Sequence, residues 1–201
     1  MIVIINTGIG NFKSIQNMLS RIGEISIISN NIREIESADK LILPGVGSFD
    51  KGMQSLQDYN LVEVIKDKAN SKNIRILGIC LGMQMLADSS EEGSLPGLGL
   101  IKGSVRHFTD KTLKIPHMGW NYAMPVRDSL LFNGCDMCSR FYFTHSYWFD
   151  CKDESNILSK TSYGHDFTSA VLSGNHIYGV QFHPEKSHRF GFQLLKNFSS
   201  C

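Results

Sequence analysis

Short apolar runs alternate with segments of helical periodicity along the first half of the chain. The runs MIVIIN, EISIIS and KLILPG are rich in β-branched residues, and apolar residues recur at helix spacing between residues 12 and 22. A further helix is expected to begin at Asn60, with Glu63 at capping-box spacing, before NIRILGI returns as a strand. This rhythm predicts βαβ units and a parallel sheet.

From about Leu95 the pattern changes to shorter apolar runs separated by Gly and Pro. The runs are LPGLGLIKGSV, KIPHMGWNY, RFYFTHSYWFD and TSAVLSGNHIYGVQFHPE, and a helix is expected near Phe190 to Phe198. Together the two halves predict an α/β fold with a doubly wound, mainly parallel sheet flanked by helices and a mixed or antiparallel extension. We expect one domain over residues 1–201.

Composition narrows the class of protein. Hydrophobic residues make up 42% and charged residues 19% of the 201 residues, and the formal net charge is +1, so neither disorder nor electrostatic binding of nucleic acid is indicated. The first apolar stretch, MIVII, is too short for a signal peptide or a membrane span. These features predict a cytoplasmic protein with no membrane and no nucleic-acid partner.

The cysteines indicate free thiols in a reducing compartment. Their number is odd and their spacing uneven: Cys80, Cys135, Cys138, Cys151 and Cys201. Cys135 and Cys138 lack the second pair that a zinc ribbon needs, so no metal and no cofactor are expected.

One cysteine lies in a sequence typical of nucleophiles. GICLGMQ, residues 78–84, places Cys80 between two glycines where a predicted strand meets a helix. Flanking glycines permit the sharp turn of a nucleophile elbow, and a helix start favours the thiolate. A buried structural cysteine is the alternative that this motif alone leaves open.

A second motif supplies partners for such a nucleophile. In GVQFHPE, residues 179–185, His183 and Glu185 would share one face of an extended segment, and Pro184 restricts the backbone. His183 could then take the thiol proton while Glu185 orients the imidazole. PGVGSF, residues 44–49, could supply backbone N–H groups for an oxyanion from Val46 and Gly47, together with that of Leu81.

With these motifs in view, the chain resembles the triad class of glutamine amidotransferases, and within it the glutaminase subunit of imidazole glycerol phosphate synthase. GICLGMQ and GVQFHPEKS resemble the class, whereas PGVGSF, SSEEG with GLGLI, IPHMGWN and YFTHSY resemble the subunit. The resemblance implies hydrolysis of glutamine to glutamate and ammonia through a thioester on Cys80, with His183 and Glu185 completing the triad. It also implies residues that line the glutamine pocket: Gly47, Gln84, Glu92, Ser146 and Tyr147.

The resemblance further implies a heterodimer. The partner would be a cyclase subunit with a (β/α)8 barrel, which uses the ammonia to make imidazole glycerol phosphate and AICAR in histidine biosynthesis. The residues that would face it are Pro116, Met118, Trp120, Asn121, Tyr142 and Lys186. Residues 44–47 would stay unproductive until the partner binds, so we expect little activity from the isolated chain.

Three alternatives remain open at this point. Ser48 replaces an alanine that many histidine-pathway members carry, and similar variants occur among paralogues whose ammonia serves a surface-sugar amidotransferase. A stand-alone cysteine hydrolase of related fold would also use an elbow cysteine and a histidine. A binding subunit without chemistry is the third, although it would not be expected to keep Cys80, His183 and Glu185 together.

Overall fold

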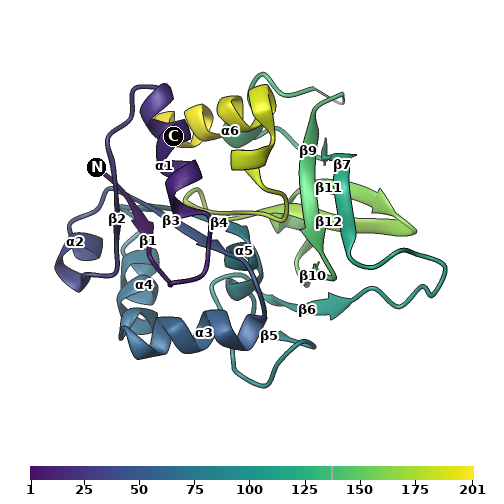
Figure 1. Cartoon of the computed structure of the whole chain (residues 1–201), viewed down its shortest axis with the longest axis horizontal. Helices are drawn as coiled ribbons and strands as arrows, with labels where there is room; N and C mark the ends of the chain where they lie inside the picture. The colour runs from purple at the N-terminus through teal and green to yellow at the C-terminus, as the bar shows by residue number, and fades with distance from the viewer. Residues whose placement is uncertain (137) are drawn as a thin grey trace.

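A central parallel sheet carries the first half of the chain. In this computed structural model, which describes every residue except 137, the parallel strands are β1 (Ile2–Ile5), β2 (Ser26–Ser29), β3 (Lys40–Gly45), β4 (Arg75–Cys80) and β13 (Ile177–Val180). They lie in the order β2-β1-β3-β4-β13 (Figure 1). The last strand of the chain therefore lies beside the strand that ends at Cys80.

Antiparallel strands extend this sheet beyond β13. The order continues through β12 (His165–Ser173), β10 (Tyr147–Cys151), β6 (Gly103–His107) and β5 (Ser89–Ser90), while β11 (Ile157–Tyr163) pairs with β12 and β8 (Met124–Pro125). A separate two-stranded sheet is formed by β7 (His117–Tyr122) and β9 (Arg140–His145). The predicted fold class, a mainly parallel sheet with an antiparallel extension, is confirmed.

Helices cover both faces of the sheet. In Figure 1, α1 (Phe12–Arg21) and α6 (His188–Ser200) lie on one face, and α3 (Phe49–Asp58) and α4 (Leu61–Asn70) on the other. The short helices are α2 (Ile32–Glu36) and α5 (Leu81–Met85), and the 3₁₀ turns are η1 (Leu130–Phe132), η2 (Glu154–Asn156) and η3 (Pro184–Lys186).

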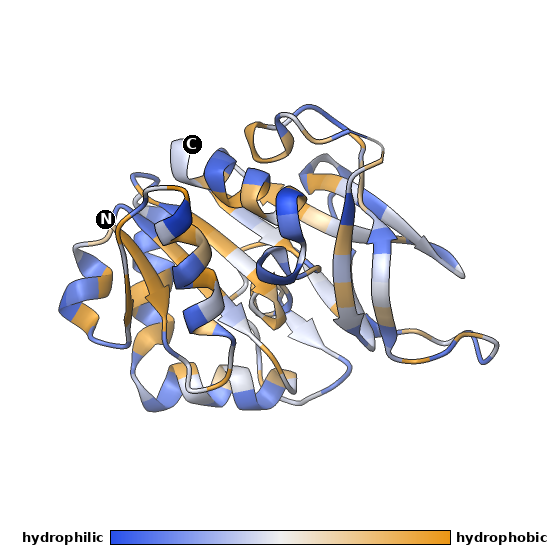
Figure 2. Ribbon diagram, turned by 45° about the horizontal axis from the view of Figure 1, so that its top comes forward, coloured by the Kyte–Doolittle hydropathy of each residue, from blue (hydrophilic) through white to orange (hydrophobic). Residues whose placement is uncertain are grey.

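Two hydrophobic cores lie on the two faces of the sheet. Successive strand residues point to opposite faces, so Val3 and Ile5 of β1 pack in one core, and Ile2 and Ile4 in the other. Both faces are covered, which explains why these strands read as continuous apolar runs, visible as orange ribbons in Figure 2.

Several local expectations need correction. Asn60 does precede α4, but its backbone is left-handed (φ 56°) and its side chain makes no capping hydrogen bond. The run RFYFTHSYWFD forms two strands in different sheets, β9 and β10, separated by Ser146. Of LPGLGLIKGSV, only the end from Gly103 onward is a strand, β6. Within the described residues, no helix has the length and apolar character needed to span a membrane.

Candidate active site

Cys80 occupies the turn between β4 and α5. Its backbone has φ 55° and ψ −110°, a conformation that residues other than glycine rarely adopt. The flanking glycines leave room for this turn: a Cβ on Gly82 would lie 1.7 Å from the carbonyl oxygen of Leu43, and one on Gly78 would lie 2.7 Å from the backbone of Gly82. The glycines therefore allow α5 to pack directly against β3 and β4.

His183 and Glu185 meet as the sequence suggested, but not on a strand. His183 has extended backbone angles and precedes η3, the 3₁₀ turn that contains Glu185. The expectation of one continuous extended segment is wrong, because Pro184 starts this turn instead. The His183 Nδ1–H still donates to Glu185 Oε1 at 2.8 Å, and both side chains are 2% exposed.

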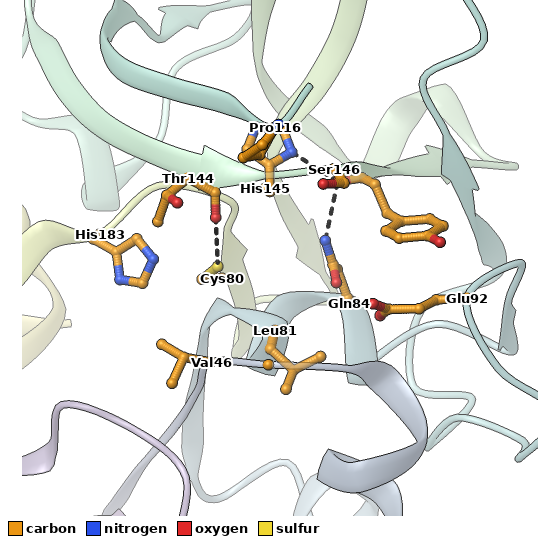
Figure 3. Close-up of a pocket in the computed structure, with 12 residues that line it drawn as sticks. Val46, Cys80, Leu81, Gln84, Glu92, Pro116, Thr144, His145, Ser146 and His183 are labelled. Atoms are coloured by element: carbon orange, nitrogen blue, oxygen red, sulfur yellow. Dashed lines mark hydrogen bonds between the residues drawn. The ribbon is translucent and has the colours of Figure 1, made fainter. Parts of the chain in front are cut away.

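The other imidazole nitrogen of His183 is available for chemistry. Nε2 is buried and has no hydrogen-bond partner among the described residues, and the ring lies beside Cys80 at the edge of a cavity (Figure 3). Burial by itself would lower the pKa of His183, but the Cys80 sulfur and the Glu185 carboxylate outweigh burial and raise this pKa to about 10. A protonated imidazole here favours a thiolate at Cys80.

The cavity has a volume of about 240 Å³ and brings together residues from distant parts of the chain. All residues expected at the glutamine site line it: Gly47, Gln84, Glu92, Ser146 and Tyr147. The residues expected to bind the oxyanion, Val46, Gly47 and Leu81, line it too. Cys80 and His183 lie at one side of the cavity, and Gln84 and Glu92 at the other (Figure 3).

Polar contacts hold the far side of the cavity in place. Glu92 Oε2 accepts a hydrogen bond from the Phe49 backbone N–H at 2.8 Å, which fixes this carboxylate at the start of α3. Gln84 donates from Nε2 to the Tyr147 carbonyl oxygen at 3.0 Å. Gly47, with φ 103°, is in a conformation that favours glycine.

The residues expected at a partner interface differ in exposure and position. Met118 and Trp120 are exposed on β7, and the Lys186 ammonium lies 5.4 Å from the centre of the Tyr142 ring. Pro116 lines the cavity. Asn121 is half-buried, and its side-chain amide contacts His117 and the Ser162 carbonyl oxygen.

Sequence reasoning missed four groups around the cavity. The Thr144 carbonyl oxygen lies 3.9 Å from Cys80 Sγ, and Gln181 Nε2 lies 3.8 Å from the same sulfur. His145 lines the cavity and contacts His117. The signal that could have found them is motif membership: Gln181 lies in GVQFHPE, Thr144 and His145 lie in YFTHSY, and His117 lies in IPHMGWN.

Comparison with known proteins identifies the family. The family model for class-I glutamine amidotransferases matches residues 3–200. The chain belongs to this family. Imidazole glycerol phosphate synthase subunit HisH 2 of Methanococcus maripaludis is 50% identical, with 98% of each chain covered, and the subunit of that name from Pseudomonas aeruginosa is 49% identical with the same coverage. The resemblance predicted from the motifs is therefore confirmed, and this amidotransferase groups with HisH subunits.

Solved structures support the fold. A crystal structure titled glutamine amidotransferase superposes with a TM-score of 0.77 at 18% identity, covering 98% of this chain and 97% of that one. The glutaminase domain of Trypanosoma brucei CTPS, solved with bound acivicin, superposes with a TM-score of 0.67 at 15% identity and covers 99% of this chain and 93% of that one. At these identities the likeness concerns the fold alone.

Proposed function

We propose that Cys80, His183 and Glu185 hydrolyse L-glutamine to glutamate and ammonia in this HisH-type glutaminase. The observation that carries the assignment is the state of His183: Glu185 holds Nδ1, while Nε2 is buried beside Cys80, with no hydrogen-bond partner among the residues that the structure describes. That is the arrangement a general acid and base needs next to a nucleophile.

The chemistry proceeds in two halves. The Cys80 thiolate attacks the side-chain amide carbon of glutamine, His183 gives its Nε2 proton to the amide nitrogen, and the C–N bond breaks to release ammonia and leave a glutamyl thioester. A water molecule then attacks the thioester carbon while His183 takes a proton from it. The C–S bond breaks, and glutamate leaves as the thiolate is restored.

The rest of the cavity fits recognition of an amino acid. Glu92 offers a carboxylate for the α-ammonium group, and Gln84, Ser146 and Tyr147 surround the remaining substrate. Val46, Gly47 and Leu81 lie where backbone N–H groups could stabilise the oxyanion, a contribution of about 3 kcal/mol per donor.

We further propose that the ammonia passes to a cyclase subunit with a (β/α)8 barrel in the cytoplasm, where it serves the synthesis of imidazole glycerol phosphate and AICAR. The relatives at 50% and 49% identity are named as subunits of imidazole glycerol phosphate synthase. Met118 and Trp120 give β7 an exposed apolar face for such a partner, and the five cysteines are all free, as in proteins of reducing compartments.

Two measurements test the chemistry and the partner separately. Acivicin should modify Cys80, glutamine should protect it, and Cys80→Ala should abolish the modification, whereas Cys138→Ser should not change it. Modification distributed over other cysteines, or no protection by glutamine, would overturn the assignment of Cys80.

Glutamate release from glutamine should then be measured for the chain alone and with a cyclase subunit and its nucleotide ligand. Strong stimulation is expected. If Cys80 is modified but the cyclase does not stimulate release, the acceptor is a different enzyme; Ser48, which departs from many histidine-pathway members, makes a surface-sugar amidotransferase the next partner to test.

A further inference from the structure

We infer that Gln181 is a positioning residue that stabilises the Cys80 thiolate through its side-chain N–H, and that Gln84 fixes the direction of this N–H. The inference rests on the proposed role of Cys80 as the nucleophile. Gln181 is fully buried, immediately follows β13, and lies on the sheet beside β4, so its side chain reaches Cys80 from within the protein.

The direction of the Gln84 amide is set by a group that can only accept. The Tyr147 carbonyl oxygen accepts a hydrogen bond from Gln84 Nε2 at 3.0 Å, so the nitrogen of this amide must face Tyr147. The second hydrogen on the same nitrogen points to Gln181 Oε1 at 3.1 Å. Both hydrogens of Gln84 Nε2 are therefore used inside the protein.

The Gln181 amide is oriented as a consequence. Its oxygen accepts from Gln84, so its nitrogen is the end that faces Cys80, with Nε2 3.8 Å from Sγ. A flip of this amide would place two N–H groups against each other and an oxygen against the sulfur. The arrangement therefore favours a sulfur that accepts a hydrogen bond.

Two histidines extend the same directional chain. The Tyr147 carbonyl oxygen also lies 2.7 Å from His145 Nδ1, which must donate to it, and His145 Nε2 then accepts from His117 Nδ1 at 3.0 Å. His117 Nε2 in turn accepts from Asn121 Nδ2 at 3.2 Å. Each hydrogen bond in this series has one allowed direction, and the series ends at Cys80.

The two forms of the cysteine have different partners. A thiol can donate to the Thr144 carbonyl oxygen 3.9 Å away, whereas a thiolate is repelled by that oxygen and can accept from Gln181. The titratable groups around the sulfur are His183 with Glu185 behind it, and Glu92, His145 and Tyr147 in the cavity. Gln181 adds a neutral donor that keeps its proton at every pH at which the protein is folded.

The test is the pH dependence of Cys80 alkylation by iodoacetamide, followed at this site by peptide mass spectrometry because four other thiols are present. Gln181→Leu keeps side-chain volume and removes the donor. Gln181→Glu keeps an oxygen for Gln84 and turns the donor into an acceptor. The midpoint of alkylation should rise by about one to two pH units in Gln181→Leu, and further in Gln181→Glu.

Ser169→Ala is the matched control, because Ser169 is fully buried next to Gln181 in the sheet and its hydroxyl bonds to Ser159 rather than to the sulfur. This variant should leave the midpoint unchanged even if it melts at a lower temperature. Equal midpoints in the wild type, Gln181→Leu and Gln181→Glu would overturn the inference, and so would a shift in Ser169→Ala as large as that in Gln181→Leu.

The results distinguish failure of the role inferred for Gln181 from failure of the proposed function. Failure of acivicin to modify wild-type Cys80 would overturn the nucleophile assignment and, with it, this role of Gln181. Modification of Cys80 by acivicin together with unshifted midpoints would overturn the role of Gln181 alone.

Discussion

His183 carries a charge in a place where burial opposes it. The side chain is 2% exposed, yet the Cys80 sulfur and the Glu185 carboxylate raise its pKa to about 10. The two neighbours act from opposite sides of the ring, because Nδ1 is held by Glu185 and Nε2 is left for the reaction. Glu185 thus favours the charged form of His183 and fixes the orientation of this proposed acid and base.

Glu185→Gln should therefore lower partner-stimulated glutamate release by roughly 10²-fold or more, since the amide keeps an oxygen near Nδ1 but removes the negative charge that favours the imidazolium. Steady-state release of glutamate measures this. Glu63→Gln, at an exposed carboxylate on α4, should leave the rate unchanged. A Glu185→Gln enzyme with wild-type activity would contradict the role given to Glu185.

The small sheet of β7 and β9 contains two buried, neutral histidines. His117 and His145 are partners in the ladder between these strands, and their rings share a hydrogen bond. Burial lowers the pKa of His117 to about 4. Burial also lowers the pKa of His145 to about 3, although the hydrogen bond to the Tyr147 carbonyl oxygen acts in the opposite direction and raises it. Both rings are unprotonated in the folded protein at neutral pH.

Stability should consequently fall as the pH drops below about 6.5, where unfolded histidines begin to take up protons and the buried pair does not. The unfolded state binds more protons in this range, so the free energy of unfolding decreases with falling pH. Between pH 6.5 and 5 the loss should be about 1.5 kcal/mol for each histidine, measured by urea unfolding. A free energy of unfolding that stays constant over this interval would show that the pair is not held neutral.

The close contact between α5 and β3 predicts that a larger residue at Gly82 destabilises the protein. A Cβ on Gly82 would lie 1.7 Å from a backbone oxygen, whereas one on Gly52 would lie 2.7 Å from the flexible thioether of Met85. Gly82→Ala should destabilise the protein by about 3 kcal/mol or more and reduce Cys80 labelling, because α5 must move. Gly52→Ala, also in a helix, should change stability by about 1 kcal/mol or less. Similar unfolding free energies for the two variants would contradict this account.

Much of this element level was accessible from the sequence. Apolar runs and helix periodicity predicted the parallel strands, because both faces of those strands are buried. The division of RFYFTHSYWFD into β9 and β10 was not predictable, since the apolar pattern continues through Ser146. The role of Gln181 was equally hidden: its contacts with Gln84 and Cys80 join residues about a hundred positions apart, and amide direction leaves no mark on a sequence.

The small sheet joins the cavity at Cys80 to the exposed face of β7, because Thr144 and His145 of β9 line the cavity and β9 pairs with β7. Trp120 is 44% exposed on this face and stacks on His188 with ring centres 5.4 Å apart. A large aromatic side chain in such a position is typical of residues that dominate binding energy at interfaces.

Trp120→Ala should weaken binding of the cyclase subunit by about 2 kcal/mol, or roughly 30-fold in Kd, while the alkylation of Cys80 in the isolated chain stays the same. Isothermal titration calorimetry measures the first quantity. Tyr59→Ala, which removes an aromatic side chain of similar exposure between α3 and α4, is the control and should bind normally. Unchanged affinity in Trp120→Ala would place the partner on another face.

The position of β13 has a consequence for how the protein is made. This strand comes from residues 177–180, yet it fills the place in the sheet between β4 and β12, and His183 and Glu185, the residues proposed to activate Cys80, follow it closely. During synthesis on the ribosome, one edge of β4, the strand that ends at Cys80, stays unpaired until nearly the whole chain has emerged. The nascent protein therefore holds Cys80 without His183 and Glu185, and a chain that terminates before these residues should not release ammonia.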